Sequence, residues 1–287
     1  MKRKITPQAS KTQPLPPPKS WFKSTFLYFL SDGPEDPKHQ GELHSFLSYI
    51  FMIIFCSAIL VYFSNPSNYY PTTKQLILGT WLFIYTLILF FSRYIGERKF
   101  YLGQIAVYDM FWQCNVSLVL SSLGAFLGKR DIVGACVVSI ALDQSMWWVD
   151  IATYITMGKF GIGVAKYITW PQTTWPRIVT ATHHLWFIPL CAYLNDGLPW
   201  NSIELSIVLV AVMSVISRYF IPFEIPFRGS MKYMNINCSY ECWKDVKIWV
   251  LHLADHKHFF YGFCLLNFAW DVGNIVCFIL IKFMIDR

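Results

Sequence analysis

Two adjacent histidines and two aspartates, all within apolar stretches, are the side chains of this sequence best suited to acid–base chemistry. His183 and His184 stand in the segment THHLWF, and Asp143 and Asp150 begin and end the segment DQSMWWVD. The aspartates are separated by close to two helical turns, so both lie on one helix face. A carboxylate that faces an imidazole can orient it as a general base. We therefore predict that His183, His184, Asp143 and Asp150 are the catalytic candidates.

The two histidines are not expected to point the same way, because neighbouring residues on a helix are about 100° apart. One imidazole should face the interior of a helix bundle, and the other should pack against or bond a neighbour. The spacing does not distinguish His183 from His184 in these roles.

Amide side chains and a further carboxylate accompany these residues in other apolar stretches. Gln113 and Asn115 stand close together, and Asn267, Asp271 and Asn274 follow an i, i+4, i+7 pattern that makes one polar stripe on a helix. We predict that all five bind substrate. The alternative is that the amides only join helices, since such hydrogen bonds contribute about 0.6 to 2 kcal/mol each within a membrane.

The sequence does not identify a cofactor, and we assign no metal ligands from it. His252 and His256 form an HxxxH pair, but a deep third ligand near them is missing. Cys238 and Cys242 form a CxxxC pair, which alone is weak evidence for zinc. Six other cysteines lie inside apolar stretches, where cysteine behaves as a small hydrophobic residue: Cys56, Cys114, Cys136, Cys191, Cys264 and Cys277. The sequence contains neither the nucleophile motif GxSxG nor a Gly-rich phosphate-binding loop.

The elements that position these residues are predicted to be membrane-spanning helices. The chain is 55% hydrophobic and only 14% charged, against about 25% charged residues in a soluble domain. Seven stretches approach the roughly 20 apolar residues that cross the hydrocarbon layer of a bilayer: approximately 45–63, 75–95, 107–127, 132–153, 178–194, 203–222 and 258–284. The fold class is therefore all-α, a polytopic membrane protein with about seven transmembrane helices in one bundle over 41–287. Because the fifth stretch is short and polar, six spans are the alternative.

Basic residues give this bundle a direction. With the N-terminus in the cytoplasm, twelve Lys and Arg residues beyond the tail fall on the inner side, and five fall outside: Lys74, Lys129, Arg130, Lys282 and Arg287. This asymmetry follows the positive-inside rule. The glycosylation sequon at Asn237 then lies in an inner loop, so a glycan on it would contradict the orientation.

Three segments outside the spans have distinct predicted roles. Residues 1–40 are basic and Pro-rich, which predicts a disordered cytoplasmic tail. Residues 157–177 mix Gly, aromatic and basic residues, as expected of a surface-lying or re-entrant segment. Residues 240–256 place apolar residues on one face, which predicts an amphipathic helix on the inner leaflet.

The polar residues inside the membrane favour an enzyme that acts on a lipid or another apolar substrate. An ionisable residue within a span normally faces protein or water and is a functional candidate. A proton-coupled transporter is an alternative, with Asp143, Asp150 and Asp271 lining a path, and so is a non-catalytic subunit of a membrane complex. The expected partners are membrane lipid and other membrane proteins. Nucleic acid is not expected, because the formal charge of +7 is not gathered on one basic face.

Overall fold

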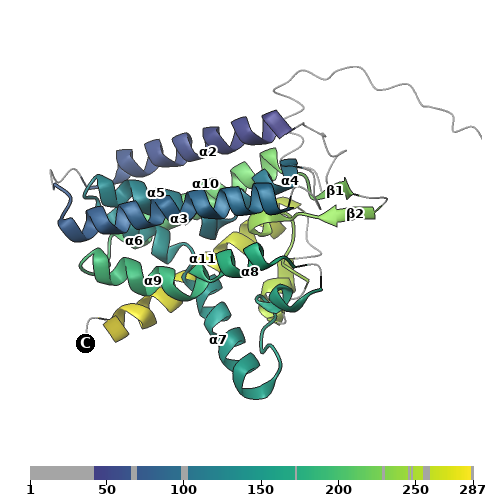
Figure 1. Ribbon diagram of the computed structural model, residues 1–287. Helices are drawn as coiled ribbons and strands as arrows, with labels where there is room; N and C mark the ends of the chain where they lie inside the picture. Colours follow the sequence, from purple (N-terminus) through teal and green to yellow (C-terminus); the bar gives the residue numbers. More distant parts are fainter. Residues whose placement is uncertain are drawn as a thin grey trace, which may run out of the picture.

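A computed structural model describes residues 42–65, 70–97, 103–171, 173–227, 230–244, 246, 248–254 and 259–285. Within these ranges the chain is helical apart from one short hairpin and the connecting turns (Figure 1). The predicted tail, 1–40, lies outside the described residues, as does His256 of the HxxxH pair.

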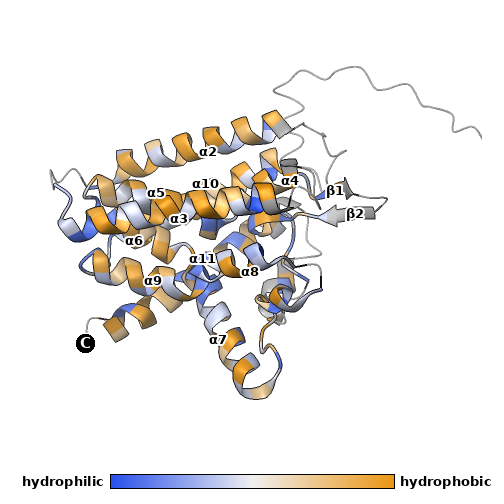
Figure 2. Cartoon of the chain, in the orientation of Figure 1, coloured by the Kyte–Doolittle hydropathy of each residue, from blue (hydrophilic) through white to orange (hydrophobic). Residues whose placement is uncertain are grey.

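Four helices are long and apolar enough to cross a membrane: α2 (Glu42–Phe63), α3 (Thr73–Glu97), α10 (Ser202–Phe220) and α11 (Phe259–Ile285). Figure 2 shows them mostly in the colour of hydrophobic residues. Large apolar side chains remain on their outer surfaces, such as Ile54 at 63%, Ile77 at 54% and Phe268 at 67% exposed. Such a surface is stable against lipid and unfavourable in water. These helices indicate a membrane protein, and they confirm four of the predicted stretches as single helices.

The three remaining stretches are interrupted helices. The stretch 132–153 forms α6 (Arg130–Val138) and α7 (Ala141–Met157), which are bent by 55° and make a fifth candidate span if counted together. The stretches 107–127 and 178–194 are divided into shorter helices: α4 (Gly103–Tyr108), the 3-10 turn η1 (Asp109–Phe111), α5 (Gln113–Phe126), α8 (Trp175–Ala181) and α9 (His183–Leu194). Among the described residues, four or five spans are therefore supported by length and composition, rather than the predicted seven.

The helices pack as a bundle. Helices α2 and α3 lie with α5, α6 and α10 in adjoining layers, α7 crosses them steeply, and α11 runs obliquely to them (Figure 1). The core joins buried apolar residues of α5, α6, α9 and α10. Gly134 of α6 lies directly against Ser202 of α10, where an added Cβ would collide with the serine side chain. A glycine is therefore required for the close contact of α6 and α10.

The turn between α6 and α7 is closed by a residue of the last helix. The Asn274 Nδ2 atom donates to the carbonyl of Ser139 at 3.0 Å, and the Asn274 Oδ1 atom accepts from the N–H of Leu142 at 2.9 Å. Such a break leaves backbone groups without helical partners, which is costly in an apolar environment. Asn274 therefore makes the bend between α6 and α7 tolerable within the bundle.

A second asparagine closes the break between η1 and α5 in the same manner. The Asn237 Nδ2 atom donates to the carbonyl of Phe111 at 2.8 Å and to the Ser217 hydroxyl at 2.8 Å. Its Oδ1 atom accepts from the N–H of Gln113 at 2.7 Å. Two of the three interrupted stretches are thus stabilised by asparagines that come much later in the chain.

Turns predicted to lie on the outer side meet at one end of the bundle. Lys74 pairs with Asp196, Lys129 donates to the carbonyl of Asn65, and Arg130 donates to the carbonyl of Asn195. These contacts join the ends of α2, α5 and α9 with the beginnings of α3 and α6.

At the opposite end lie a loop and a hairpin. The described residues of 158–174 contain the short η2 (Lys166–Thr169), and β1 (Glu224–Phe227) pairs antiparallel with β2 (Ser230–Tyr233). The segment that follows contains η3 (Ile236–Cys238) and η4 (Trp249–Ala254), where an amphipathic helix over 240–256 was predicted. Cys242 and Val246 are instead buried in a small core with Leu266 of α11, beside the contact of Trp243 with Trp270.

Candidate functional site

The histidine pair stands where α8 ends and α9 begins. The Nδ1 atom of His183 lies 2.6 Å from the carbonyl of Thr180, and the Nδ1 atom of His184 lies 2.8 Å from the carbonyl of Ala181. A carbonyl oxygen only accepts, so each Nδ1 must carry a proton, and in the neutral ring the lone pair is then on Nε2. The local fold therefore fixes one tautomer for both rings.

Both histidines face the same region of the interior, so the expectation that only one does so is wrong. His183 is fully buried and His184 is 6% exposed, and their ring centroids are 4.1 Å apart. Each ring folds back onto the preceding turn to reach its carbonyl, which brings the rings together although the Cα–Cβ bonds diverge.

Asp143 of α7 lies opposite this pair. Its Oδ2 atom is 3.5 Å from the Nε2 atom of His184. Trp147, one turn further along α7, stacks on the His184 ring with a centroid distance of 4.5 Å. The indole N–H of Trp148 donates to the backbone carbonyl of His184 at 3.1 Å. Three neighbouring residues of α7 thus hold His184 in place.

Tyr167 of η2 reaches this arrangement from the loop 158–174 and packs against Trp147. Its ring packs edge-on against Trp147 at a centroid distance of 5.8 Å. Burial raises the pKa of Tyr167, so its hydroxyl stays protonated at neutral pH. The loop 158–174 therefore adds an aromatic cover to the histidine site.

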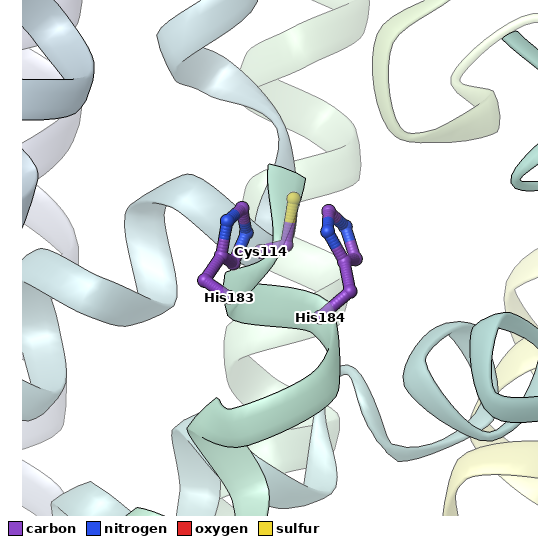
Figure 3. A group of neighbouring side chains, drawn as sticks. All are labelled: Cys114, His183 and His184. Atoms are coloured by element: carbon purple, nitrogen blue, oxygen red, sulfur yellow. The ribbon is translucent and has the colours of Figure 1, made fainter. Parts of the chain in front are cut away.

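Cys114 completes the cluster, and sequence reasoning missed it. Its Sγ atom and one ring nitrogen of each histidine all lie within 4.8 Å of one another. Figure 3 shows the sulfur between the two imidazole rings. Cys114 was read as an apolar residue, although Gln113 and Asn115 on either side were a signal of a polar environment. The break at Trp112 sets the direction of Cys114, and the sequence pattern did not predict that break.

A cleft leads from this cluster toward the last helix. Its wall contains Cys114 and Asp143 together with two predicted substrate-binding residues, Gln113 and Asn267. Three tryptophans form much of the apolar wall: Trp112, Trp243 and Trp270. The cleft therefore presents one carboxylate and several polar groups in a largely apolar space.

The other three predicted substrate-binding residues lie outside the lining of the cleft. Asn115 is buried and donates to the carbonyl of Asp109 at 2.7 Å, and Asn274 closes the bend between α6 and α7. The Oδ1 atom of Asp271 is buried without a hydrogen-bond partner among the described residues. These three do not appear among the residues that line the cleft.

The carboxylate of Asp150 holds the loop that follows α7. Its Oδ1 atom accepts from the N–H groups of Ile162 at 2.7 Å and Gly163 at 3.0 Å, and its Oδ2 atom accepts from those of Gly163 at 3.0 Å and Ala165 at 2.9 Å. Backbone donors thus bond both oxygens. Of the two aspartates predicted as partners of the histidines, the structure places Asp143 beside His184 and Asp150 on the loop.

Two arginines bring positive charge to this region. Arg177 of α8 pairs with Asp109 at 3.0 Å, and Arg93 of α3 is 4% exposed. The charge of Arg93 interacts with Cys114 and with both histidines.

Comparison with models of protein families, with curated proteins and with solved structures gave no match to this chain. The fold and the cluster define the class of protein by themselves: a helical membrane protein with a buried group of ionisable side chains beside a cleft.

Proposed function

We propose that this protein is an intramembrane enzyme that acts on a lipid or another apolar substrate by acid–base chemistry. The observation that carries the proposal is the 3.5 Å approach of His184 to Asp143, a residue of the cleft wall. An ionisable group at the wall of a concave, largely apolar site, with a second one directly behind it, is typical of catalytic centres.

The pair is suited to hold and move one proton. The His184 Nε2 atom carries a lone pair, and the facing carboxylate can stabilise the imidazolium that forms when this atom takes a proton. At 3.5 Å the two atoms are further apart than in a typical hydrogen bond, which spans about 2.7 to 3.2 Å. Catalytic hydrogen bonds in empty sites are often long and shorten when substrate binds.

The walls of the cleft favour an apolar substrate that carries a polar atom. Trp112, Trp243 and Trp270 offer apolar surface, and Gln113 and Asn267 offer amides for hydrogen bonds with a substrate oxygen. A lipid that enters from the bilayer has this combination of an apolar chain and polar oxygens.

A transporter would need a polar path from the cleft to the opposite end of the bundle. Along this direction α6 contributes a run of buried apolar side chains: Ile132, Val133, Ala135, Cys136, Val137 and Val138. This run favours a closed reaction site over a path across the membrane. We further propose that the protein spans the membrane several times with its N-terminus in the cytoplasm, on the charge asymmetry of its loops.

The test is to incubate purified protein with a total membrane lipid extract in mild detergent and to follow new products by mass spectrometry. We expect a product with the wild type, and a loss of about 100-fold or more in its rate of formation with Asp143→Asn and with His184→Ala. Asp196→Asn is the matched control, because Asp196 pairs with Lys74 in a half-exposed ion pair at the other end of the bundle. Unchanged turnover in Asp143→Asn and His184→Ala, or no product with the wild type, would contradict the proposal.

A further inference from the structure

We propose that Cys114, His183 and His184 bind a zinc ion. The three potential ligand atoms lie within 4.8 Å of one another in the buried interior (Figure 3). Ligand atoms of a tetrahedral zinc ion, with bonds of about 2.0 to 2.3 Å, stand roughly 3.3 to 3.6 Å apart. The three side chains therefore need to move together by little more than about 1 Å to meet this geometry.

The tautomers of the histidines are those that a metal requires. Each Nδ1 atom is occupied by a backbone carbonyl, that of Thr180 for His183 and that of Ala181 for His184. Histidines that bind a metal through one nitrogen usually donate the other N–H to a carbonyl or carboxylate, which fixes the ring and raises its basicity. Both Nε2 lone pairs are thus available to one cation.

His183 supplies an independent observation that points to a ligand. Its Nε2 atom is buried and has no hydrogen-bond partner among the described residues. A buried acceptor without a partner is costly, and such an atom in a native structure requires an explanation. A cation between this nitrogen and Cys114 satisfies it.

Donor chemistry and charge favour zinc. One soft thiolate and two imidazoles form a set that zinc binds readily, whereas magnesium and calcium prefer oxygen ligands. The Cys114 thiolate and the Asp143 carboxylate together balance the charge of a divalent ion, which a buried site in a membrane requires.

The fourth position of the ion would face Asp143 and the cleft, since Asp143 borders His184 on the side where the cleft lies. Three protein ligands and one open position are typical of catalytic zinc, which polarises a substrate oxygen or a bound water. The inference rests on the proposed function and names a cofactor for the same site, but it changes the role of His184. With zinc bound, the Nε2 atom of His184 is a ligand and no longer the base, and Asp143 would carry the proton in its place.

The test measures metal without any substrate. The full-length protein is purified in mild detergent without chelators, dialysed against a low concentration of zinc, and analysed by inductively coupled plasma mass spectrometry. We expect about one zinc ion per chain in the wild type, and a loss of more than about tenfold in Cys114→Ala and His183→Ala. The matched control is Cys136→Ala, which removes another buried cysteine outside the cluster and should retain the zinc.

A second measurement needs no variant and so does not depend on how the variants fold. Replacing zinc by cobalt in the wild-type protein should produce a sulfur-to-cobalt charge-transfer absorption, because Cys114 is a ligand. Wild-type protein that takes up neither zinc nor cobalt overturns the inference, as does zinc that persists in both ligand variants. Asp143→Asn separates the two proposals, since it should keep its zinc and lose turnover. If the wild type turned over substrate without bound metal, the proposed enzyme function would stand and the proposed zinc site would be wrong.

Discussion

Two asparagines of α11 have different surroundings. Asn267 lies at the wall of the cleft and donates to the carbonyl of Phe263, whereas Asn274 bonds two backbone groups across the bend between α6 and α7. The sequence places both on one helix, close to two turns apart. Their roles differ because α11 lies against the bend at one level and against the cleft at another, which only the tertiary structure specifies.

Asn274→Ala should destabilise the fold, because it leaves the carbonyl of Ser139 and the N–H of Leu142 buried without partners. Each such group costs about 1 to 3 kcal/mol, so the loss should be about 2 to 5 kcal/mol in the free energy of unfolding. Thermal or denaturant unfolding in detergent, followed by circular dichroism, measures it. Asn201→Ala is the control, since Asn201 precedes α10 without a capping hydrogen bond from its side chain. Equal stability of the two variants would show that the bend does not depend on Asn274.

The candidate site was predictable from the sequence only in part. Residue type and helical spacing predicted His183, His184 and Asp143 as candidates, and the structure places these three side chains together. Cys114 was not predictable, because a cysteine within an apolar stretch is ordinarily a packing residue. The helix breaks beside Cys114 and before His183 turn these side chains toward each other, and such breaks depend on distant partners rather than on local pattern.

At the scale of elements, α7 and the loop after it form one unit. The helix ends at Gly158, whose φ of 69° is left-handed and suits glycine. The chain then returns so that the N–H groups of Ile162, Gly163 and Ala165 meet the Asp150 carboxylate. Hydrogen bonds to a charged acceptor are the stronger kind, so Asp150 fixes the loop that carries Tyr167 over the site.

Asp150→Asn should therefore loosen this loop. An amide has one acceptor oxygen, and its NH2 group would face backbone donors. We expect amide hydrogen exchange over 160–165 to rise by about tenfold or more, because a hydrogen bond to a charged group contributes about 1.5 to 3 kcal/mol. Mass spectrometry of proteolytic peptides measures the exchange, with peptides from α10 as the internal control. Unchanged exchange together with lost turnover would instead assign Asp150 to catalysis.

Hydropathy predicted the long elements well and the interrupted ones less well. The stretches 45–63, 75–95, 203–222 and 258–284 appear as single helices, because a uniform apolar stretch has no alternative in a membrane. The apolar stretches do not reveal where a helix is interrupted. Two of the interruptions are tolerated because, at each, an asparagine later in the chain bonds the backbone groups that the break leaves without helical partners.

At the scale of the whole molecule, contacts at one end of the bundle join three turns that the sequence predicts to lie on the same side of the membrane. The ion pair of Lys74 with Asp196 and the bonds of Lys129 and Arg130 unite the turns assigned to the outer side. The sequon at Asn237 is not a useful probe of orientation, because its Nδ2 atom is engaged by Phe111 and Ser217 within the fold. An unmodified Asn237 is therefore expected on either side of the membrane.

Introduced cysteines can test the orientation directly. Tyr70 is 93% exposed at the end assigned to the outer side, and Lys159 is exposed in the loop assigned to the cytoplasm. A membrane-impermeant maleimide should label Lys159→Cys, but not Tyr70→Cys, when only the cytoplasmic face is accessible in selectively permeabilised cells. The wild-type chain measures the background from native cysteines such as Cys264. The reverse labelling pattern would show that the N-terminus lies on the other side.

The asparagine contacts have a consequence for how this protein is made. Gln113, Cys114 and Asp143 emerge from the ribosome long before Asn237 and Asn274, which close the breaks beside them. Until Asn237 and then α11 with Asn274 have been made, the two breaks have unsatisfied backbone groups, and the chain is in a state that cellular quality control can recognise. The surroundings of the histidine cluster are therefore completed only after α11 has been made, so a chain truncated before α11 should be degraded.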